Sequence, residues 1–158
     1  KGHYPKLICS PMEVESGIPT DYFDFVYSIY AIGWTTDLVG TFKRIASYLK
    51  KDGVFIFSWQ HPLHGCVFVE DDKLIFKKSY FNEECFTQQV HGCDIRLSIR
   101  KISTYINALS EAGFLIEQMI EQTDKQTLDI TEDMTERSKK AQMLPLSFVF
   151  KARKRILT

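Results

Sequence analysis

The chain has 158 residues, of which 44% are hydrophobic and 25% are charged, a composition typical of one globular domain with its own core. Its 20 acidic and 20 basic side chains cancel, so no overall field favours nucleic acid or an anionic membrane as a partner. The acidic segment 117–136 and the basic segment 137–158 are better explained as solvated faces, or as a mutual pairing, than as a polyanion site.

The cysteines give no sign of an oxidising compartment or of a metal site. Cys9, Cys66, Cys85 and Cys93 have no CxxC spacing, and there is no signal peptide or apolar run of bilayer length. The histidines and cysteines between residues 61 and 93 fit no familiar zinc pattern. We therefore expect a cytoplasmic protein with reduced thiols and without a metal.

The first part of the chain contains candidate strands. Residues 7–9 form a short apolar strand candidate, and residues 23–28 form a longer one without polar alternation. A continuous apolar run predicts a buried parallel strand, covered on both faces by helices.

A helix and a second strand follow. Thr35, Thr36 and Asp37 are candidate N-caps, and the apolar positions 38, 42, 45 and 49 share one helical face. Asp52 and Gly53 end this helix, and residues 54–58 form the next strand. In the resulting βαβ unit, residues 28–34 and 58–62 both follow strand ends, where open α/β sheets bind ligands. We expect them to share one cleft.

Residues 63–97 form a long insertion that contains a small hairpin, 67–69 with 74–76, and several aromatic residues. Ser103 is the expected cap of a helix that ends at Gly113, and residues 114–120 and 144–150 form the last strands. This order of elements predicts an α/β fold.

Four segments of the chain carry a resemblance to a known family. They are DYFDFVYSIYAIGWTTD, LKKDGVFIFS, STYINALSEAGF and LPLSFVFKARK, in this order. Together they resemble the later two-thirds of a Rossmann-like S-adenosylmethionine-dependent methyltransferase of the small-molecule kind called type 11 or 12, over residues 7–154. The resemblance implies a mostly parallel sheet with flanking helices and an antiparallel last strand. It also implies S-adenosylmethionine as cofactor and a small-molecule methyl acceptor.

The amino end departs from the family pattern. The glycine-rich GxGxG loop and the acidic residue that holds the ribose hydroxyls are missing, so the chain begins near the family's third strand. We expect an upstream segment of a longer protein to supply them, and little activity from these residues alone. Ser10-Pro11-Met12-Glu13 occupies the adenine loop, where the family often has an Asp-Ala pair, and Asp52 replaces a common glycine.

The resemblance assigns a set of cofactor residues. Tyr27, Ser28 and Ile29 match the strand end that borders the methionine part of the cofactor, and Met12 and Glu13 match the adenine loop. The alternatives are an ordinary strand end, a core methionine and a solvated glutamate.

The acceptor side is predicted from residue types near the strand ends. His61, in the SWQHP segment, is the candidate catalytic base, with a structural histidine as the alternative. Tyr30, Trp34, Tyr80 and Phe81 are candidate substrate walls, with core packing as the alternative. The insertion 63–97 is the expected substrate lid, closing with Phe68, Phe76, Tyr80 and Phe81.

Two functions follow from these observations. The first is transfer of a methyl group from S-adenosylmethionine to a small molecule. The second is a non-catalytic fragment, or a degenerate homologue, that acts through protein contacts, as the missing glycine loop suggests. The acceptor atom and the oligomeric state do not follow from the sequence, and nucleic-acid binding by the basic tail is a weaker third hypothesis.

Overall fold

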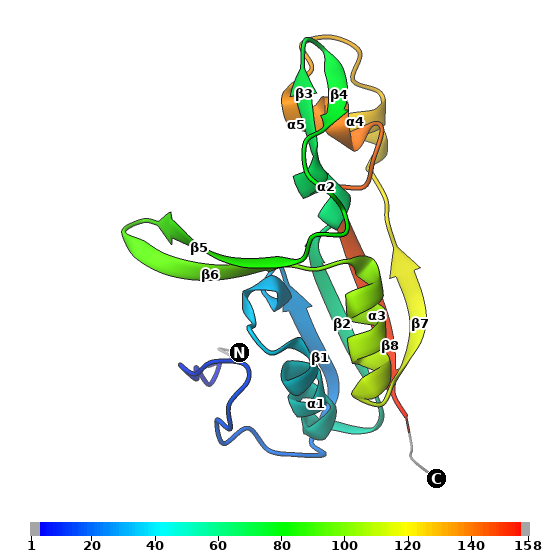
Figure 1. The fold of residues 1–158 in the computed structure, drawn as a ribbon. Coiled ribbons are helices and arrows are strands. Elements are labelled where there is room, and N and C mark those ends of the chain that lie inside the picture. The colour runs from blue at the N-terminus through cyan, green and yellow to red at the C-terminus, as the bar shows by residue number, and fades with distance from the viewer. Residues whose placement is uncertain (1–3, 156–158) are drawn as a thin grey trace.

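A four-stranded sheet is the centre of the fold. In the computed structural model, which describes residues 4–155, its order is β1-β2-β8-β7 (Figure 1). The strands are β1 (Phe23–Ile29), β2 (Leu49–Gln60), β7 (Phe114–Ile120) and β8 (Ser147–Lys154). β1 and β2 are parallel, whereas β8 is antiparallel to both of its neighbours. The predicted α/β fold with an antiparallel last strand is confirmed.

Two helices cover one face of this sheet. α1 (Leu38–Tyr48) begins after Asp37, whose carboxylate accepts a hydrogen bond from the Gly40 N–H at 2.9 Å, as an N-cap should. α3 (Ile102–Glu111) packs against α1 and β7, and both helices lie in front of the sheet in Figure 1. The aromatic core lies beneath them and consists of Phe42, Phe55, Phe57, Tyr105, Phe148 and Phe150.

β2 is longer than predicted because it starts directly at the end of α1. Its pairing with β1 jumps from Phe23↔Leu49 to Phe25↔Val54, so residues 50–53 bulge out of the ladder. Asp52 in this bulge has φ of 60°, the left-handed region that favours glycine.

β1 is not buried on both faces, contrary to the prediction. It is an edge strand, and Phe25, Tyr27 and Ile29 are 67%, 75% and 70% exposed. Within the described residues, the helices that pack on the sheet lie together on one face, so the second face of β1 has no cover. Residues 7–9 form no strand, and they belong to an irregular segment that reaches β1.

The insertion forms two hairpins instead of one. After the short helix α2 (Pro62–Cys66), β3 (Val67–Glu70) pairs with β4 (Lys73–Phe76), as predicted. The longer hairpin of β5 (Glu84–Val90) and β6 (Cys93–Ile99) was not predicted. In Figure 1, β3–β4 stands at the top beside α4 (Lys125–Leu128) and α5 (Glu136–Ala141), whereas β5–β6 projects sideways over the end of β1.

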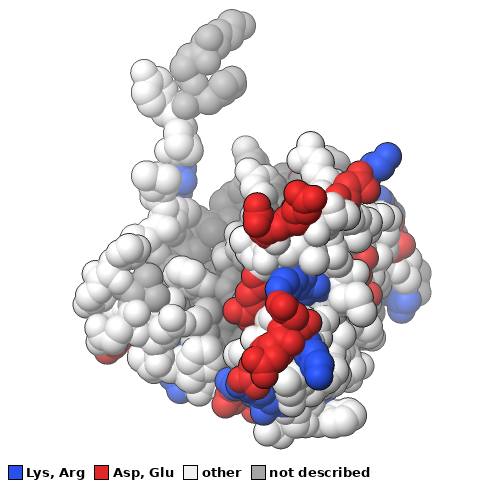
Figure 2. Space-filling view, turned by 90° about the horizontal axis from the view of Figure 1, so that it is seen from above, with Lys and Arg blue, Asp and Glu red and all other residues white. Residues whose placement is uncertain are grey.

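The charged segments pair with each other in part. Glu117 on β7 contacts Lys151 and Arg153 on β8, and hydrogen bonds from these two bases lower the pKa of Glu117 to about 2. Acidic and basic side chains are intermingled on the face that Figure 2 shows. Local pairing therefore explains at least this part of the charge segregation along the chain.

Residues 4–155 contain neither a metal-ligand cluster nor a membrane-spanning helix. No cluster of three or more histidine, cysteine, aspartate or glutamate side chains is arranged to hold a metal ion. No helix in the same part of the chain combines the length and the apolar character needed to cross a membrane.

Candidate functional site

A pocket of about 690 Å³ lies beside β1, and its volume is in the range of small-molecule sites. Four of the five expected cofactor residues line it: Met12, Tyr27, Ser28 and Ile29. The remaining walls come from three parts of the chain: the irregular segment before β1 (Ile8, Ser10, Pro11, Ser16 and Ile18), β1 and the residues after it (Phe23, Phe25, Val26 and Ala31), and α1 (Thr41, Ile45 and Tyr48). The sequence prediction therefore brought together residues that share one cavity.

The carboxyl end of β1 carries two unusual features. The Ser28 hydroxyl oxygen is buried and has no hydrogen-bond partner within the described residues, although it lines the pocket. Tyr30, just after the strand, has φ of 49°, a conformation that costs an aromatic residue energy and that occurs at functional sites. Its backbone N–H donates a hydrogen bond to the Ser58 carbonyl at 3.1 Å. This bond attaches the turn after β1 to the neighbouring strand β2.

Glu13 does not line this pocket. Its carboxylate accepts hydrogen bonds from the Thr35 hydroxyl at 2.6 Å and from the Thr36 N–H at 2.7 Å. Partial burial works to raise the pKa of Glu13, but these hydrogen bonds outweigh it and hold the pKa below its usual value. Glu13 thus ties the irregular segment to the start of α1.

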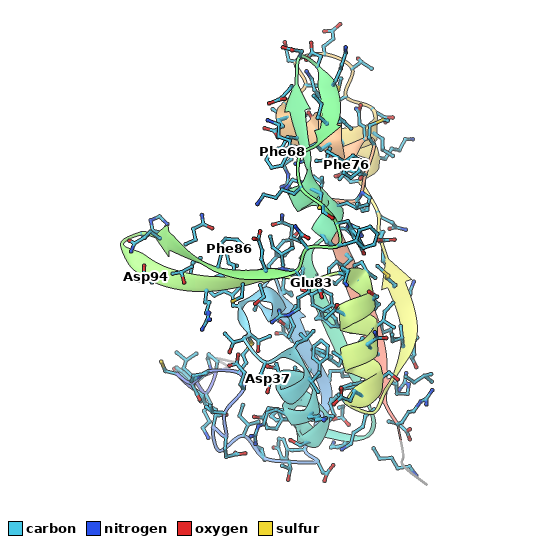
Figure 3. The ribbon with its side chains drawn as sticks, viewed as in Figure 1. Asp37, Phe68, Phe76, Glu83, Phe86 and Asp94 are labelled. Carbon is cyan, nitrogen blue, oxygen red and sulfur yellow. The ribbon has the colours of Figure 1, made fainter. Side chains whose placement is uncertain are left out.

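A second, smaller pocket of about 90 Å³ lies between the end of β2 and the β5–β6 hairpin. β2 and the residues after it contribute Trp59, Gln60 and His61, and the hairpin contributes Phe86 and Leu97. Figure 3 shows Phe86 on the hairpin, well away from Phe68 and Phe76 on the other one. The strand ends therefore border two pockets, where the sequence predicted one shared cleft.

His61 is 2% exposed, and both of its ring nitrogens have partners. Nδ1 accepts a hydrogen bond from the Leu63 N–H at 3.1 Å, so Nε2 carries the proton that it shares with Glu121 at 2.6 Å. Burial lowers the pKa of His61, and this outweighs the opposing effect of the Glu121 carboxylate. The ring is a neutral, fully engaged group and has no free lone pair to take up a proton.

Trp59 links the smaller pocket to the turn after β1. Its ring lines the smaller pocket, and its centroid lies 6.0 Å from that of Tyr30. Gly33, in the short helix η1 (Ile32–Trp34), packs so closely against Trp59 that a Cβ at this position would overlap the indole. Of the expected substrate walls, Tyr30 contacts Trp59 but is itself in the lining of neither pocket.

The other three expected substrate residues line neither pocket. Trp34 is half exposed on η1. The Tyr80 hydroxyl accepts a hydrogen bond from the Ile102 N–H at 3.2 Å and so holds the start of α3. Phe81 is 80% exposed and packs edge-on against Tyr80.

Sequence reasoning missed the contribution of the second hairpin. Phe86, Leu97, Ser98 and Ile99 line the smaller pocket, together with Arg100 just beyond the hairpin. A signal was present: residues 94–99 alternate polar and apolar, and His91-Gly92 forms a two-residue turn in which both residues have positive φ.

Comparisons with known proteins identify the family model and the fold that this chain resembles. Residues 1–57 match the family model described as "Methyltransferase domain". A search of the curated proteins finds no match.

Solved structures with a similar fold cover nearly the whole chain. A Listeria monocytogenes protein described as an S-adenosylmethionine-dependent methyltransferase has 24% identity and a TM-score of 0.72, covering 92% of this chain and 67% of its own. A Mesorhizobium loti S-adenosylmethionine-dependent methyltransferase has 21% identity and a TM-score of 0.73, with the same coverages. The 1,6-didemethyltoxoflavin-N1-methyltransferase of Burkholderia thailandensis, solved with its substrate and S-adenosylhomocysteine, has 16% identity and a TM-score of 0.53, covering 93% and 49%.

This chain spans about two thirds of the length of the first two of these proteins. The resemblance found in the sequence is confirmed: the chain has the fold of S-adenosylmethionine-dependent methyltransferases, and residues 1–57 match the family model of their methyltransferase domain.

Proposed function

We propose that this chain is part of a methyltransferase that transfers a methyl group from S-adenosylmethionine to a small-molecule acceptor. The observation that carries the proposal is the pocket beside β1, which joins Met12, Tyr27 and Ile29 around the unpartnered hydroxyl of Ser28. The fold and the family match of residues 1–57 support it.

The pocket suits part of the cofactor. Its lining is mainly apolar, as a purine ring requires, and Met12 offers a polarizable side chain to cover such a ring. The Ser28 hydroxyl can donate to a polar atom of the ligand, which would relieve the cost of its burial. Among the described residues that line the pocket there is no carboxylate, so we assign no partner to the ribose hydroxyls.

Methyl transfer asks mainly for positioning. When bound, S-adenosylmethionine supplies an already activated methyl group on its sulfonium. The chain's part is then to hold the acceptor in line with that methyl group and to keep water away. We propose that Tyr30 and Trp59 form the wall between the cofactor pocket and the acceptor pocket, because their rings are neighbours at the strand ends.

The lid role expected for the insertion 63–97 is best supported for the β5–β6 hairpin. This hairpin contacts η1 and places Phe86 and Leu97 on the smaller pocket. The β3–β4 hairpin instead packs on α5, where Lys139 pairs with Asp72 and the Lys140 ammonium lies 5.5 Å from the Phe68 ring. We therefore propose β5–β6 as the acceptor lid.

For His61 we propose a positioning role in place of the expected catalytic one. Its two hydrogen bonds join the start of α2 to the end of β7, and its ring packs edge-on against Phe148. These contacts hold the segment that turns from β2 into the insertion. A base is needed only where the acceptor carries a proton at the reacting atom.

Titration calorimetry with S-adenosylhomocysteine tests the proposal on the full-length protein. We expect binding, and Ser28→Ala should weaken it about threefold to tenfold through loss of one hydrogen bond. Phe76→Ala on the exposed β4 strand is the matched control and should bind like the wild type. Absence of binding at about millimolar ligand would contradict the enzyme proposal.

The alternative function keeps one specific observation in its favour. The edge strand β1 exposes three apolar side chains, Phe25, Tyr27 and Ile29. An exposed apolar edge of this kind can pair with a strand of a partner protein or pack against it. Two results on the full-length protein together would favour this protein-contact role. The protein would fail to bind S-adenosylhomocysteine, and its β1 amides would exchange hydrogen in the isolated protein but be protected when a partner is bound.

A further inference from the structure

Arg100 lies between β6 and α3 and is one of the residues that line the smaller pocket. One of its terminal nitrogens, Nη2, donates to the Thr35 carbonyl at 2.5 Å. The other, Nη1, is buried and has no hydrogen-bond partner within the described residues. A guanidinium cannot lose its proton in a protein, so this is a permanent charge with a buried, unused donor group.

No protein carboxylate compensates this charge within residues 4–155. The arginine ion pairs in that part of the chain are those of Arg44 and Arg153. Glu83 is occupied elsewhere, because it accepts hydrogen bonds from the Lys101 N–H and the Thr104 hydroxyl. Arg100 is partly buried, and a charge that is partly removed from water without an ion pair loses solvation, which points to a partner from outside the protein.

The other groups that line the smaller pocket are neutral or apolar. Burial lowers the pKa of His61 in this pocket against the opposing effect of Glu121, and the hydrogen bond that Nδ1 accepts from the Leu63 N–H requires the neutral ring. Burial raises the pKa of Tyr105 to about 12, with the charge of Arg100 and a hydrogen-bond contact to it opposing the shift, so this phenol also stays neutral. The Tyr105 hydroxyl therefore lies beside the guanidinium, although, like Nη1, it makes no hydrogen bond of full geometry among the described residues. Trp59, Phe86 and Leu97 supply flat or apolar walls.

We propose that Arg100 binds a carboxylate of the methyl acceptor, whose apolar or aromatic part packs against Trp59 and Phe86. A carboxylate matches the planar fork of the guanidinium and carries one negative charge, which balances one arginine beside a neutral histidine. A phosphate would bring excess charge into a pocket of about 90 Å³. The inference rests on the proposed function, because it assigns the substrate class of the same enzyme.

Binding of benzoate and of its neutral isostere benzamide tests the charge requirement in the full-length wild type. Ligand-observed NMR at low salt is suitable, because an affinity in the range of about millimolar is expected for so small a probe. We expect benzoate to bind at least about tenfold more tightly than benzamide or phenyl phosphate. Equal affinities, tighter binding of phenyl phosphate, or no binding of benzoate would each overturn the inference.

Variants separate recognition of a charge from a merely structural role of Arg100. Arg100→Met should remove the preference for benzoate over benzamide, whereas Arg100→Lys should keep part of it. Arg96→Met removes an exposed charge from the adjoining strand β6 and is the matched control, which should leave the preference intact. If Arg100 only anchored the Thr35 carbonyl, its loss would weaken both probes equally, and that result would contradict the proposal.

The same sample distinguishes this inference from the proposed function. Binding of S-adenosylhomocysteine without any preference for benzoate would overturn the carboxylate assignment alone. Failure to bind S-adenosylhomocysteine would contradict the methyltransferase proposal whatever the benzoate result.

Discussion

The Nε2 atom of His61 lies 2.6 Å from Oε1 of Glu121, and this contact joins the residue after β2 to the residue after β7. β8 lies between β2 and β7, so the contact between His61 and Glu121 passes across the start of this antiparallel strand. Because the Leu63 N–H donates to Nδ1, the two contacts together require a neutral imidazole with its proton on Nε2.

This arrangement predicts a loss of stability in mild acid. The pKa of His61 is lower in the folded protein than the usual 6.5, so the unfolded chain takes up the proton first as pH falls. Stability should therefore be complete above about pH 6.5 and should decrease as pH falls toward the lowered pKa. Urea unfolding of the wild type at about pH 7.5, 6.5 and 5.5 measures the decrease.

His61→Gln should flatten this pH dependence, because the amide does not titrate. Some slope should remain, since burial also lowers the pKa of His64. His91→Asn is the control, because asparagine tolerates the positive φ of the hairpin turn. A wild-type slope that His61→Gln leaves unchanged would show that His61 is not the responsible group.

The βαβ unit was predictable because its signals are local. An apolar run, an aspartate cap and a helical stripe lie within a few residues of one another, and each is visible without knowing the rest of the fold. The pocket residues Tyr27, Ser28 and Ile29 were assigned from the family resemblance, which agrees with the topological rule that ligands bind at the ends of parallel strands.

The features that the sequence did not predict depend on contacts between distant segments of the chain. Glu121 is separated from His61 by most of the later chain, so the sequence gives no sign that this carboxylate occupies the imidazole. Arg100 is a single arginine at a strand-to-helix junction, and only the fold shows that its Nη1 has no partner within the described residues. The exposure of β1 depends on its neighbours in the sheet, which an apolar run does not reveal.

Gly33→Ala should disturb the wall between the two pockets. A Cβ at this position would overlap the Trp59 indole, and overpacking of this kind costs about 1–3 kcal/mol. Gly65→Ala is the matched control, because its new Cβ would meet only the Gln60 side chain at 3.9 Å. Denaturant unfolding and the tryptophan emission spectrum measure both variants. Equal stability of the two variants would show that Trp59 moves aside freely.

Glu83→Ala should destabilise the start of α3. The structure places Lys101 at the N-cap without a side-chain cap of its own, and Glu83 accepts from its N–H at 2.7 Å. Partial burial works to raise the pKa of Glu83, but hydrogen bonds from Thr104 and Lys101 outweigh it and lower this pKa. The stabilisation that Glu83 gives to α3 should therefore be lost as pH falls through the lowered pKa.

The expected cost of Glu83→Ala is about 1 kcal/mol, as for loss of an N-cap. Ser103→Ala tests the cap that the sequence suggested, and it should be nearly neutral because Ser103 is exposed on the first turn of the helix. Thermal unfolding at neutral pH compares the two variants. If Ser103→Ala lost more thermal stability than Glu83→Ala, Ser103 would be the cap of α3, as the sequence predicted.

Phe86→Ala tests the choice of lid between the two hairpins. Phe86 lines the smaller pocket from β5, whereas Phe76 on β4 is 67% exposed on the other hairpin. Removing the Phe86 ring takes away apolar contact area but no charge, so benzoate and benzamide should both bind about threefold to tenfold more weakly. Phe76→Ala should change neither affinity, and S-adenosylhomocysteine should bind both variants like the wild type. If Phe76→Ala alone weakened the binding of benzoate and benzamide, the lid would be β3–β4. Only a phenylalanine on the hairpin that covers the acceptor pocket can contact both probes.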